Sequence, residues 1–232
     1  MISIIIPTLN EAESIGPVVT SLPRDVVDRV VVADGGSVDG TVEQARHAGA
    51  EVIAAGRGYG RACLAGALAA EGAEILVFMD GDGADDPKVI AAIVAPIRAG
   101  EYEFVIGSRA RGEREPGSMS SHQIFAGQVA GWLIRLLYGV RYTDMCAFRA
   151  IRRDTLLTLG MRELTYGWNL EMQMRVARAG LRVLELPVPY RRRLAGESKV
   201  AGSLRGSVVA GLRIMSTFAR IAIAPTRKHT TG

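Results

Sequence analysis

Two aspartates one residue apart, Asp80 and Asp82, follow directly after the apolar run Ile75–Met79. Carboxylates at this spacing, where a buried strand ends, can share one hard divalent cation while that cation also holds a diphosphate. Crowding this much negative charge is unfavourable unless a cation or solvent compensates it. The pattern therefore predicts a metal site. The next acidic pair, Asp85-Asp86, is expected to cap the following helix.

Apolar segments alternate with helical segments along the first half of the chain. The expected strands are Ile2–Ile6, Arg29–Ala33, Glu51–Ala55, Ile75–Asp80 and Phe104–Gly107. The expected helices cover residues 11–21, 41–48, 61–70 and 87–99. Uniformly apolar strands alternating with helices predict an α/β fold whose mostly parallel sheet is covered by helices on both faces. In such sheets, ligands bind at the carboxyl ends of the strands. The residues at these ends are Pro7, Asp34, Gly56, Asp80 and Ser108.

The second half of the chain is less regular. A polar, glycine-rich loop at 112–121 is expected to be mobile. Helices are expected at 122–138 and 168–179, and strands at 148–151 and 181–186. All of these parts belong to one predicted domain, residues 1–203. Residues 204–232 are expected to form an appended C-terminal amphipathic helix and a frayed tail.

The basic residues of that C-terminal helix suggest a partner. Arg205, Arg213 and Arg220 fall within about 80° of one another on a helical wheel. A basic stripe beside a broad apolar face is typical of a helix that lies in the plane of a membrane surface. Packing of the helix on the domain, or on a second subunit in a homo-oligomer, stays open.

The net charge of +4 hides an asymmetry, because the acidic residues gather in the first half and the basic residues in the second. This distribution suits a nucleotide–metal site that faces a phosphate-rich acceptor or a membrane surface. Nucleic acid is not an expected partner, because no nucleic-acid-binding motif occurs. Met1 leads straight into a strand and no apolar run reaches the ~18 residues of a membrane span. The expected location is the cytoplasm, including the cytoplasmic face of the membrane.

Three ordered motifs, Pro7–Glu11, Asp34–Thr41 and Asp80–Asp82, resemble the inverting family 2 glycosyltransferases of the GT-A (Rossmann-like) fold. Two further motifs, Asp144–Ala150 and Arg193–Lys199, are similar to the branch that contains dolichyl-phosphate mannose synthase and other polyprenyl-phosphate glycosyltransferases. The resemblance spans residues 2 to about 202. It implies transfer of a hexose from a UDP- or GDP-sugar to polyprenyl or dolichyl phosphate, with Mg²⁺ or Mn²⁺ as cofactor.

The resemblance also implies roles for individual residues. Pro7, Asn10 and Glu11 would line the nucleotide pocket, with Asp34 at the base. The metal and the diphosphate of the donor would be held by the DXD motif of Asp80 and Asp82. Arg109 and Arg149 are expected to contact phosphate groups. Arg193 and Lys199 are expected to close over the phosphates of the donor and the acceptor.

Two alternatives remain open from the residues alone. Glu171 lies where many relatives place a carboxylate that activates a hydroxyl acceptor, and a sugar hydroxyl needs such a general base. An ion pair with Arg175, four residues on, is the structural explanation for the same residue. The glycine loop Gly56–Gly60 follows a strand, with Asp80 further on, and so imitates the fingerprint of an NAD-dependent oxidoreductase. Otherwise Gly58 would let this loop approach the nucleotide closely.

Overall fold

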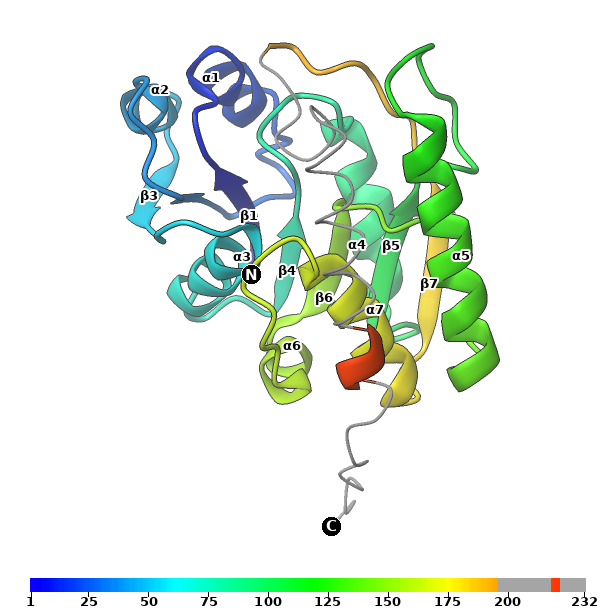
Figure 1. The fold of residues 1–232 in the computed structure, drawn as a ribbon. Helices are drawn as coiled ribbons and strands as arrows, with labels where there is room; N and C mark the ends of the chain where they lie inside the picture. Colours follow the sequence, from blue (N-terminus) through cyan, green and yellow to red (C-terminus); the bar gives the residue numbers. More distant parts are fainter. Residues whose placement is uncertain (196–217, 222–232) are drawn as a thin grey trace.

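The computed structural model describes residues 1–195 and 218–221. Within them, a seven-stranded sheet has the order β3-β2-β1-β4-β6-β5-β7 (Figure 1). The strands are β1 Ile2–Thr8, β2 Arg29–Asp34, β3 Glu51–Ala54, β4 Ile75–Phe78, β5 Phe104–Ser108, β6 Arg149–Arg152 and β7 Val183–Pro187. β6 runs antiparallel to β4 and β5, and the other neighbouring pairs are parallel. The predicted mostly parallel sheet is confirmed.

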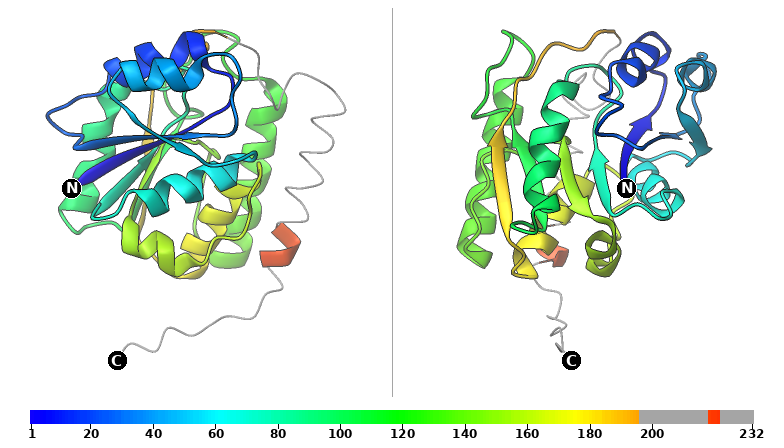
Figure 2. Two further views of the ribbon diagram at one scale, coloured as in Figure 1. Left: turned by 90° about the vertical axis from the view of Figure 1, so that its left-hand side faces the viewer. Right: turned by 180° about the vertical axis from the view of Figure 1, so that it is seen from behind.

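The helices lie on both faces of this sheet, as predicted. They are α1 Ala12–Thr20, α2 Thr41–His47, α3 Tyr59–Ala69, α4 Ile90–Arg98 after the 3₁₀ turn Pro87–Val89, α5 Ser121–Tyr138, α6 Arg153–Leu159 and α7 Trp168–Arg178. In β6, Arg149 donates a hydrogen bond to the carbonyl of Asn169 in α7, whereas Arg152 donates to the carbonyl of Ile97 in α4. Because side chains alternate along a strand, α7 and α4 lie on opposite faces (Figure 2).

The central strands are buried along nearly their whole length because both faces are covered. All residues of β1, β4 and β5 are buried, which explains their continuous Ile, Val, Leu and Phe content. The register pairs Thr8 at the end of β1 with Asp34 at the end of β2. The carboxyl ends of these strands therefore meet at one edge of the sheet, together with the end of β4.

The loop at 112–120 is fixed to the segment that follows β7, and the expectation of a mobile loop is not supported. The amide of Glu115 donates to the carbonyl of Tyr190, and the amide of Arg192 donates to the Glu115 carboxylate. A Cβ on Gly112 would lie 1.9 Å from the carbonyl oxygen of Val188, so the two segments meet backbone to backbone. The expected C-terminal helix lies outside the described residues except for 218–221. Within that turn, Ile221 is buried and its carbonyl accepts a bond from Arg178 of α7.

Candidate active site

Two loops interlock at the carboxyl ends of β1 and β2. The Asn10 amide donates to the Ser37 hydroxyl at 2.8 Å, and the Val38 amide donates to the Asn10 side chain at 3.0 Å. Asn10 has a φ of 53°, a left-handed conformation that Asn tolerates better than most residues. The Glu11 amide donates to the Thr41 hydroxyl at 2.8 Å. The two motifs expected to line a nucleotide pocket thus form one rigid wall.

Asp34 organises this wall. One carboxylate oxygen accepts the amides of Gly36 and Ser37, each at 2.9 Å, and the other accepts the hydroxyls of Ser37 and Thr8. The residue is 6% exposed. Pro7 is buried one residue before the end of β1. The structure brings the predicted nucleotide-pocket residues together, and a contact of Asp34 with a base stays a prediction.

A cluster of three aspartates lies beside this wall, just after β4. The Tyr59 hydroxyl donates to Asp80 Oδ1 at 3.1 Å, and the Asp80 amide donates to Asp85 Oδ2 at 3.4 Å. The Ala84 amide donates to Asp82 Oδ1 at 2.9 Å. The other oxygen of Asp82, Oδ2, is buried and accepts no hydrogen bond in the described part of the chain.

Asp80, Asp82 and Asp85, here named the acid cluster, bring negative charges close together, and two of the three carboxyls respond with raised pKa values. Burial and then the charge of Asp82 raise the pKa of Asp80 to about 6, although Tyr59, Arg109 and Arg193 oppose the shift. Burial, and then the charges of Asp80 and Asp82, raise the pKa of Asp85 well above its ordinary value. A bound cation would relieve both effects.

The cluster fits a hard divalent cation. It offers carboxylate oxygens, which Mg²⁺ and Mn²⁺ prefer, and among the described residues the buried Asp82 Oδ2 accepts no hydrogen bond. Among residues 1–195 and 218–221, no group of three or more His, Cys, Asp or Glu side chains is arranged to hold a metal alone. A cation held by Asp80 and Asp82 would therefore take its remaining ligands from water or from the oxygens of a donor.

The acidic pair at 85–86 divides between two roles. Asp86 caps the turn that begins α4, because its side chain accepts the Lys88 amide at 3.1 Å, as expected. The same expectation is wrong for Asp85, whose carboxylate points to the Asp80 amide and belongs to the acid cluster. Both residues are buried, and their hydrogen-bond partners distinguish them, since Asp86 accepts an amide of the following turn and Asp85 accepts the Asp80 amide.

The segment Arg191–Leu194, here named the cover segment, lies across the acid cluster. Its backbone is fixed to the loop after β4, because the Arg191 amide donates to the Ala84 carbonyl and the Leu194 amide to the Asp82 carbonyl, each at 2.9 Å. Arg193 Nη2 lies 3.0 Å from Asp82 Oδ2, and Nη1 lies 3.9 Å from Glu11 Oε1. The Arg193–Asp82 contact is an ion pair without the alignment of a hydrogen bond. Lys199 lies outside the described residues.

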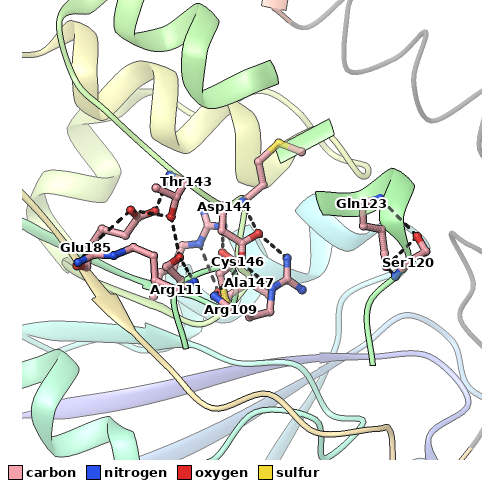
Figure 3. A network of polar contacts seen from close by, with 12 residues as sticks. Arg109, Arg111, Ser120, Gln123, Thr143, Asp144, Cys146, Ala147 and Glu185 are labelled. Atoms are coloured by element: carbon pink, nitrogen blue, oxygen red, sulfur yellow. Dashed lines mark hydrogen bonds and ion pairs between the residues drawn. The ribbon is translucent and has the colours of Figure 1, made fainter. Parts of the chain in front are cut away.

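Arg109 lies at the other side of the cluster. It makes a bidentate pair with Asp144, with both nitrogen–oxygen distances at 2.8 Å (Figure 3), and its guanidinium stacks 4.9 Å from the ring centre of Tyr190. Burial acts to raise the pKa of Asp144, but the hydrogen bonds and charge of Arg109 bring it below its ordinary value. Asp144 thus holds Arg109 where its charge acts on Asp80 and Asp85.

Two predicted site residues are fully buried instead of facing a ligand. Arg149 donates to the backbone carbonyls of Cys146, Ala147 and Asn169, and burial lowers its pKa. This placement fixes the loop before β6 to α7 and does not present the guanidinium to a phosphate. The prediction of a phosphate contact from Arg149 is therefore not supported.

Glu171 is the other buried residue. Its carboxylate accepts the amides of Arg162 and Glu163, at 2.9 and 2.6 Å, and pairs with Arg175 at 2.9 Å. A general base must reach the proton of the acceptor, and the Glu171 side chain is 0% exposed. The structure favours the structural role of Glu171 over the role of base.

The backbone at Gly58 lies close to another segment of the protein, the one around Leu164. A Cβ at this position, where φ is +131°, would lie 2.4 Å from the carbonyl oxygen of Leu164. Gly60 meets the carbonyl of Glu163 in the same way, at 2.2 Å. The glycine loop therefore packs on the segment before α7, which corrects the expectation that Gly58 approaches the nucleotide. Tyr59, between these glycines, is the site residue that the motifs did not reveal.

With this geometry established, comparison with known proteins decides the family. Residues 3–160 match the family described as Glycosyl transferase family 2. The chain belongs to this family. Membership excludes the NAD-dependent oxidoreductase suggested by the glycine loop and makes the protein a glycosyltransferase.

Curated relatives support the assignment over most of the chain. An uncharacterized glycosyltransferase of Mycobacterium tuberculosis is 36% identical over 212 residues, covering 90% of this chain and 94% of the relative. The undecaprenyl-phosphate mannosyltransferase of Micrococcus luteus is 34% identical over 224 residues, covering 88% of this chain and 89% of the relative.

A solved structure shares the GT-A fold. Glucosyl-3-phosphoglycerate synthase from Mycobacterium tuberculosis, in complex with Mn²⁺, UDP-glucose and phosphoglyceric acid, superposes with a TM-score of 0.75 at 23% identity. The alignment covers 97% of this chain and 81% of that chain. None of the helices in the described part of the chain is long and apolar enough to cross a bilayer.

Proposed function

We propose that this glycosyltransferase moves a hexose from a nucleotide-diphosphate sugar to a polyprenyl phosphate, with inversion at the sugar and with Mg²⁺ or Mn²⁺ as cofactor. The observation that carries the proposal is the acid cluster. Its carboxylates lie at the carboxyl edge of a mostly parallel sheet, and the buried Asp82 Oδ2 accepts no hydrogen bond from the described residues. Such a site is built for a cation and its anionic ligand.

The donor side follows from the positions of the charged residues. Asp80 and Asp82 would hold the metal, whose chemistry is to stabilise the negative charge that grows on the departing diphosphate. Arg193, 3.0 Å from Asp82, would move its charge to the diphosphate once the cation occupies the cluster. Arg109 and Lys199 would add positive charge around the phosphate groups. The structural neighbour solved with Mn²⁺ and UDP-glucose supports this arrangement.

The acceptor side rests on a relative and on proton chemistry. The Micrococcus luteus relative is named for transfer of mannose to undecaprenyl phosphate. A phosphate oxygen of such a lipid is already ionised near neutral pH, so it attacks without a base. The new bond joins that oxygen to the anomeric carbon, and the bond from the anomeric carbon to the donor diphosphate breaks with its electron pair. This reaction is compatible with Glu171 being buried and fully paired.

Transfer to a soluble hydroxyl acceptor is the second candidate, because the structural neighbour was solved with phosphoglyceric acid. A hydroxyl acceptor requires a general base, and the residue predicted for that role, Glu171, is inaccessible. This mismatch ranks the hydroxyl acceptor below the lipid phosphate.

Product analysis by mass spectrometry separates the two acceptors. The enzyme is incubated with Mn²⁺ and a panel of UDP- and GDP-sugars, together with undecaprenyl phosphate, undecaprenol or phosphoglyceric acid. We expect a glycosylated product from undecaprenyl phosphate and none from undecaprenol, which differs only in lacking the phosphate. Product from phosphoglyceric acid alone would reject the lipid acceptor and keep the glycosyltransferase.

A further inference from the structure

Helix α5 is apolar on two opposite faces. Its buried face consists of Gly127, Ala130, Gly131 and Ile134. Its exposed large apolar residues are Phe125, Val129, Trp132, Leu136 and Leu137, and the first four are here named the α5 outer face. At 100° per residue, these four fall within about 60° of one another and about 180° from the centre of the buried face. A helix with a second apolar face opposite its buried face is expected to have that second face covered as well.

All four residues of the α5 outer face are exposed to solvent in the structure. Phe125 and Leu136 are each 68% exposed and Trp132 is 62% exposed. The helix lies at the margin of the molecule (Figure 1), and its other side packs on the domain. Contiguous exposed apolar residues of this size mark a surface that binds something else.

The charged residues on and near α5 indicate which kind of surface the α5 outer face binds. The helix sequence contains no Asp or Glu. Arg135, beside the α5 outer face, and Arg141, just beyond the end of the helix, are both exposed. A second copy of this face would bring like charges together without an acidic residue on α5 to pair with them. An anionic lipid surface supplies the missing negative charge, and an exposed tryptophan followed by arginines at the end of its helix suits the boundary between acyl chains and headgroups.

The buried face of α5 connects this surface to the active site. A Cβ on Gly131 would lie 2.0 Å from the carbonyl oxygen of Tyr142, and one on Gly127 would lie 3.6 Å from the Asp144 Cα. Asp144 in turn holds Arg109 next to the acid cluster (Figure 3). A surface docked on the outside of α5 is thus one helix away from the residues that hold Arg109.

We propose that α5 lies in the surface of a membrane containing anionic lipids, with the α5 outer face inserted among the acyl chains. The inference deepens the proposed function and rests on it, because a membrane held there is the source of a lipid phosphate acceptor. The membrane contact through α5 is separate from the one expected of the C-terminal helix at residues 204–232. The α5 outer face includes none of those residues.

The two tryptophans make insertion directly measurable. Trp132 is exposed on α5, whereas Trp168 is 0% exposed in the core. The full chain is mixed with vesicles of neutral phosphatidylcholine, or of phosphatidylcholine with phosphatidylglycerol, in the absence of donor and acceptor. With the anionic vesicles we expect a blue shift of the emission and loss of quenching by acrylamide. Trp132→Phe should abolish both signals and leave vesicle binding in place.

Binding itself is measured by sedimentation with the vesicles. Leu136→Ser should weaken binding about tenfold or more, since a leucine is removed from the inserted face. Leu68→Ser is the matched control, because Leu68 is 51% exposed on α3, and it should bind like the wild type.

Two results would overturn the proposal. The first is binding with an unshifted, quenchable Trp132, which would place the contact elsewhere on the chain. The second is loss of a dimer in Leu136→Ser with no change in vesicle binding, which would make the α5 outer face a subunit interface. These experiments measure membrane binding and no glycosyl transfer. They therefore test the membrane proposal even if the proposed transfer reaction turns out to be wrong.

Discussion

Replacing Asp80 by Asn is expected to stabilise the metal-free protein near neutral pH. The pKa of Asp80 is raised from 3.8 to about 6 by burial and by the charge of Asp82. At about 1.4 kcal/mol per pKa unit, keeping this carboxylate ionised costs about 3 kcal/mol of folding free energy. Asn has no charge and its Oδ1 can still accept the hydroxyl of Tyr59. For a domain of this size, the gain corresponds to a rise of roughly 6–12 °C in Tm.

The stability gain of Asp80→Asn should depend on pH in a defined direction. A carboxyl with a raised pKa carries no penalty below 3.8, where it is protonated in both the folded and the unfolded state. The penalty grows as the pH rises through about 6 and is complete above it. The gain in Tm of Asp80→Asn should therefore be full at about pH 8 and nearly absent at about pH 4.

The assay is thermal unfolding in EDTA across this pH range. Asp154→Asn is the matched control, because Asp154 is an exposed aspartate in the first turn of α6, and it should show no such gain. An Asp80→Asn protein that is less stable than the wild type at about pH 8 would refute the charge crowding in the acid cluster.

Three other variants test single features of the structure. Glu171→Gln should lower the free energy of unfolding by about 1–3 kcal/mol through the lost ion pair with Arg175. It should leave kcat on a polyprenyl phosphate within about threefold of wild type, and a loss of several orders of magnitude in kcat would restore Glu171 as base. Gly58→Ala should lower Tm strongly, because its Cβ would lie 2.4 Å from the Leu164 carbonyl oxygen. Gly16→Ala, whose nearest contact is 3.8 Å away within α1, should have a neutral or higher Tm, and equal Tm values for both glycine variants would contradict the close approach. Asp144→Asn should weaken donor binding while the fold persists, measured by calorimetry, since Arg109 loses half of a charged pair.

The sheet and the paired aspartates Asp80 and Asp82 were predictable because their signals are local. Strands buried on both faces need continuous apolar runs, and the run Ile75–Met79 followed by Asp80 and Asp82 carries that signal within a few residues. Parallel pairing then forces the ends of β1, β2 and β4 to one edge, so the motifs after these strands meet. The interlocked loops after β1 and β2 follow from the same rule.

The roles of residues with distant partners were not predictable. Gly58 is required by the carbonyl of Leu164, and nothing near Gly58 in the sequence indicates that contact. The cover segment is fixed to the loop after β4 across more than a hundred residues, as in the ion pair between Arg191 and Asp86. Arg149 is a comparable case, because the residues around it in the sequence give no sign that its guanidinium bonds to buried carbonyls.

The central claim is that the acid cluster binds a sugar nucleotide through a divalent cation. Isothermal calorimetry with UDP- and GDP-sugars, with Mn²⁺ or with EDTA, tests it on the wild type, on Asp82→Asn and on Asp86→Asn. We predict that one nucleotide binds the wild type only with Mn²⁺, that Asp82→Asn abolishes this binding, and that Asp86→Asn, altered in the capping residue next to the cluster, retains it. Equal affinity in EDTA, or unchanged binding by Asp82→Asn, would contradict the account.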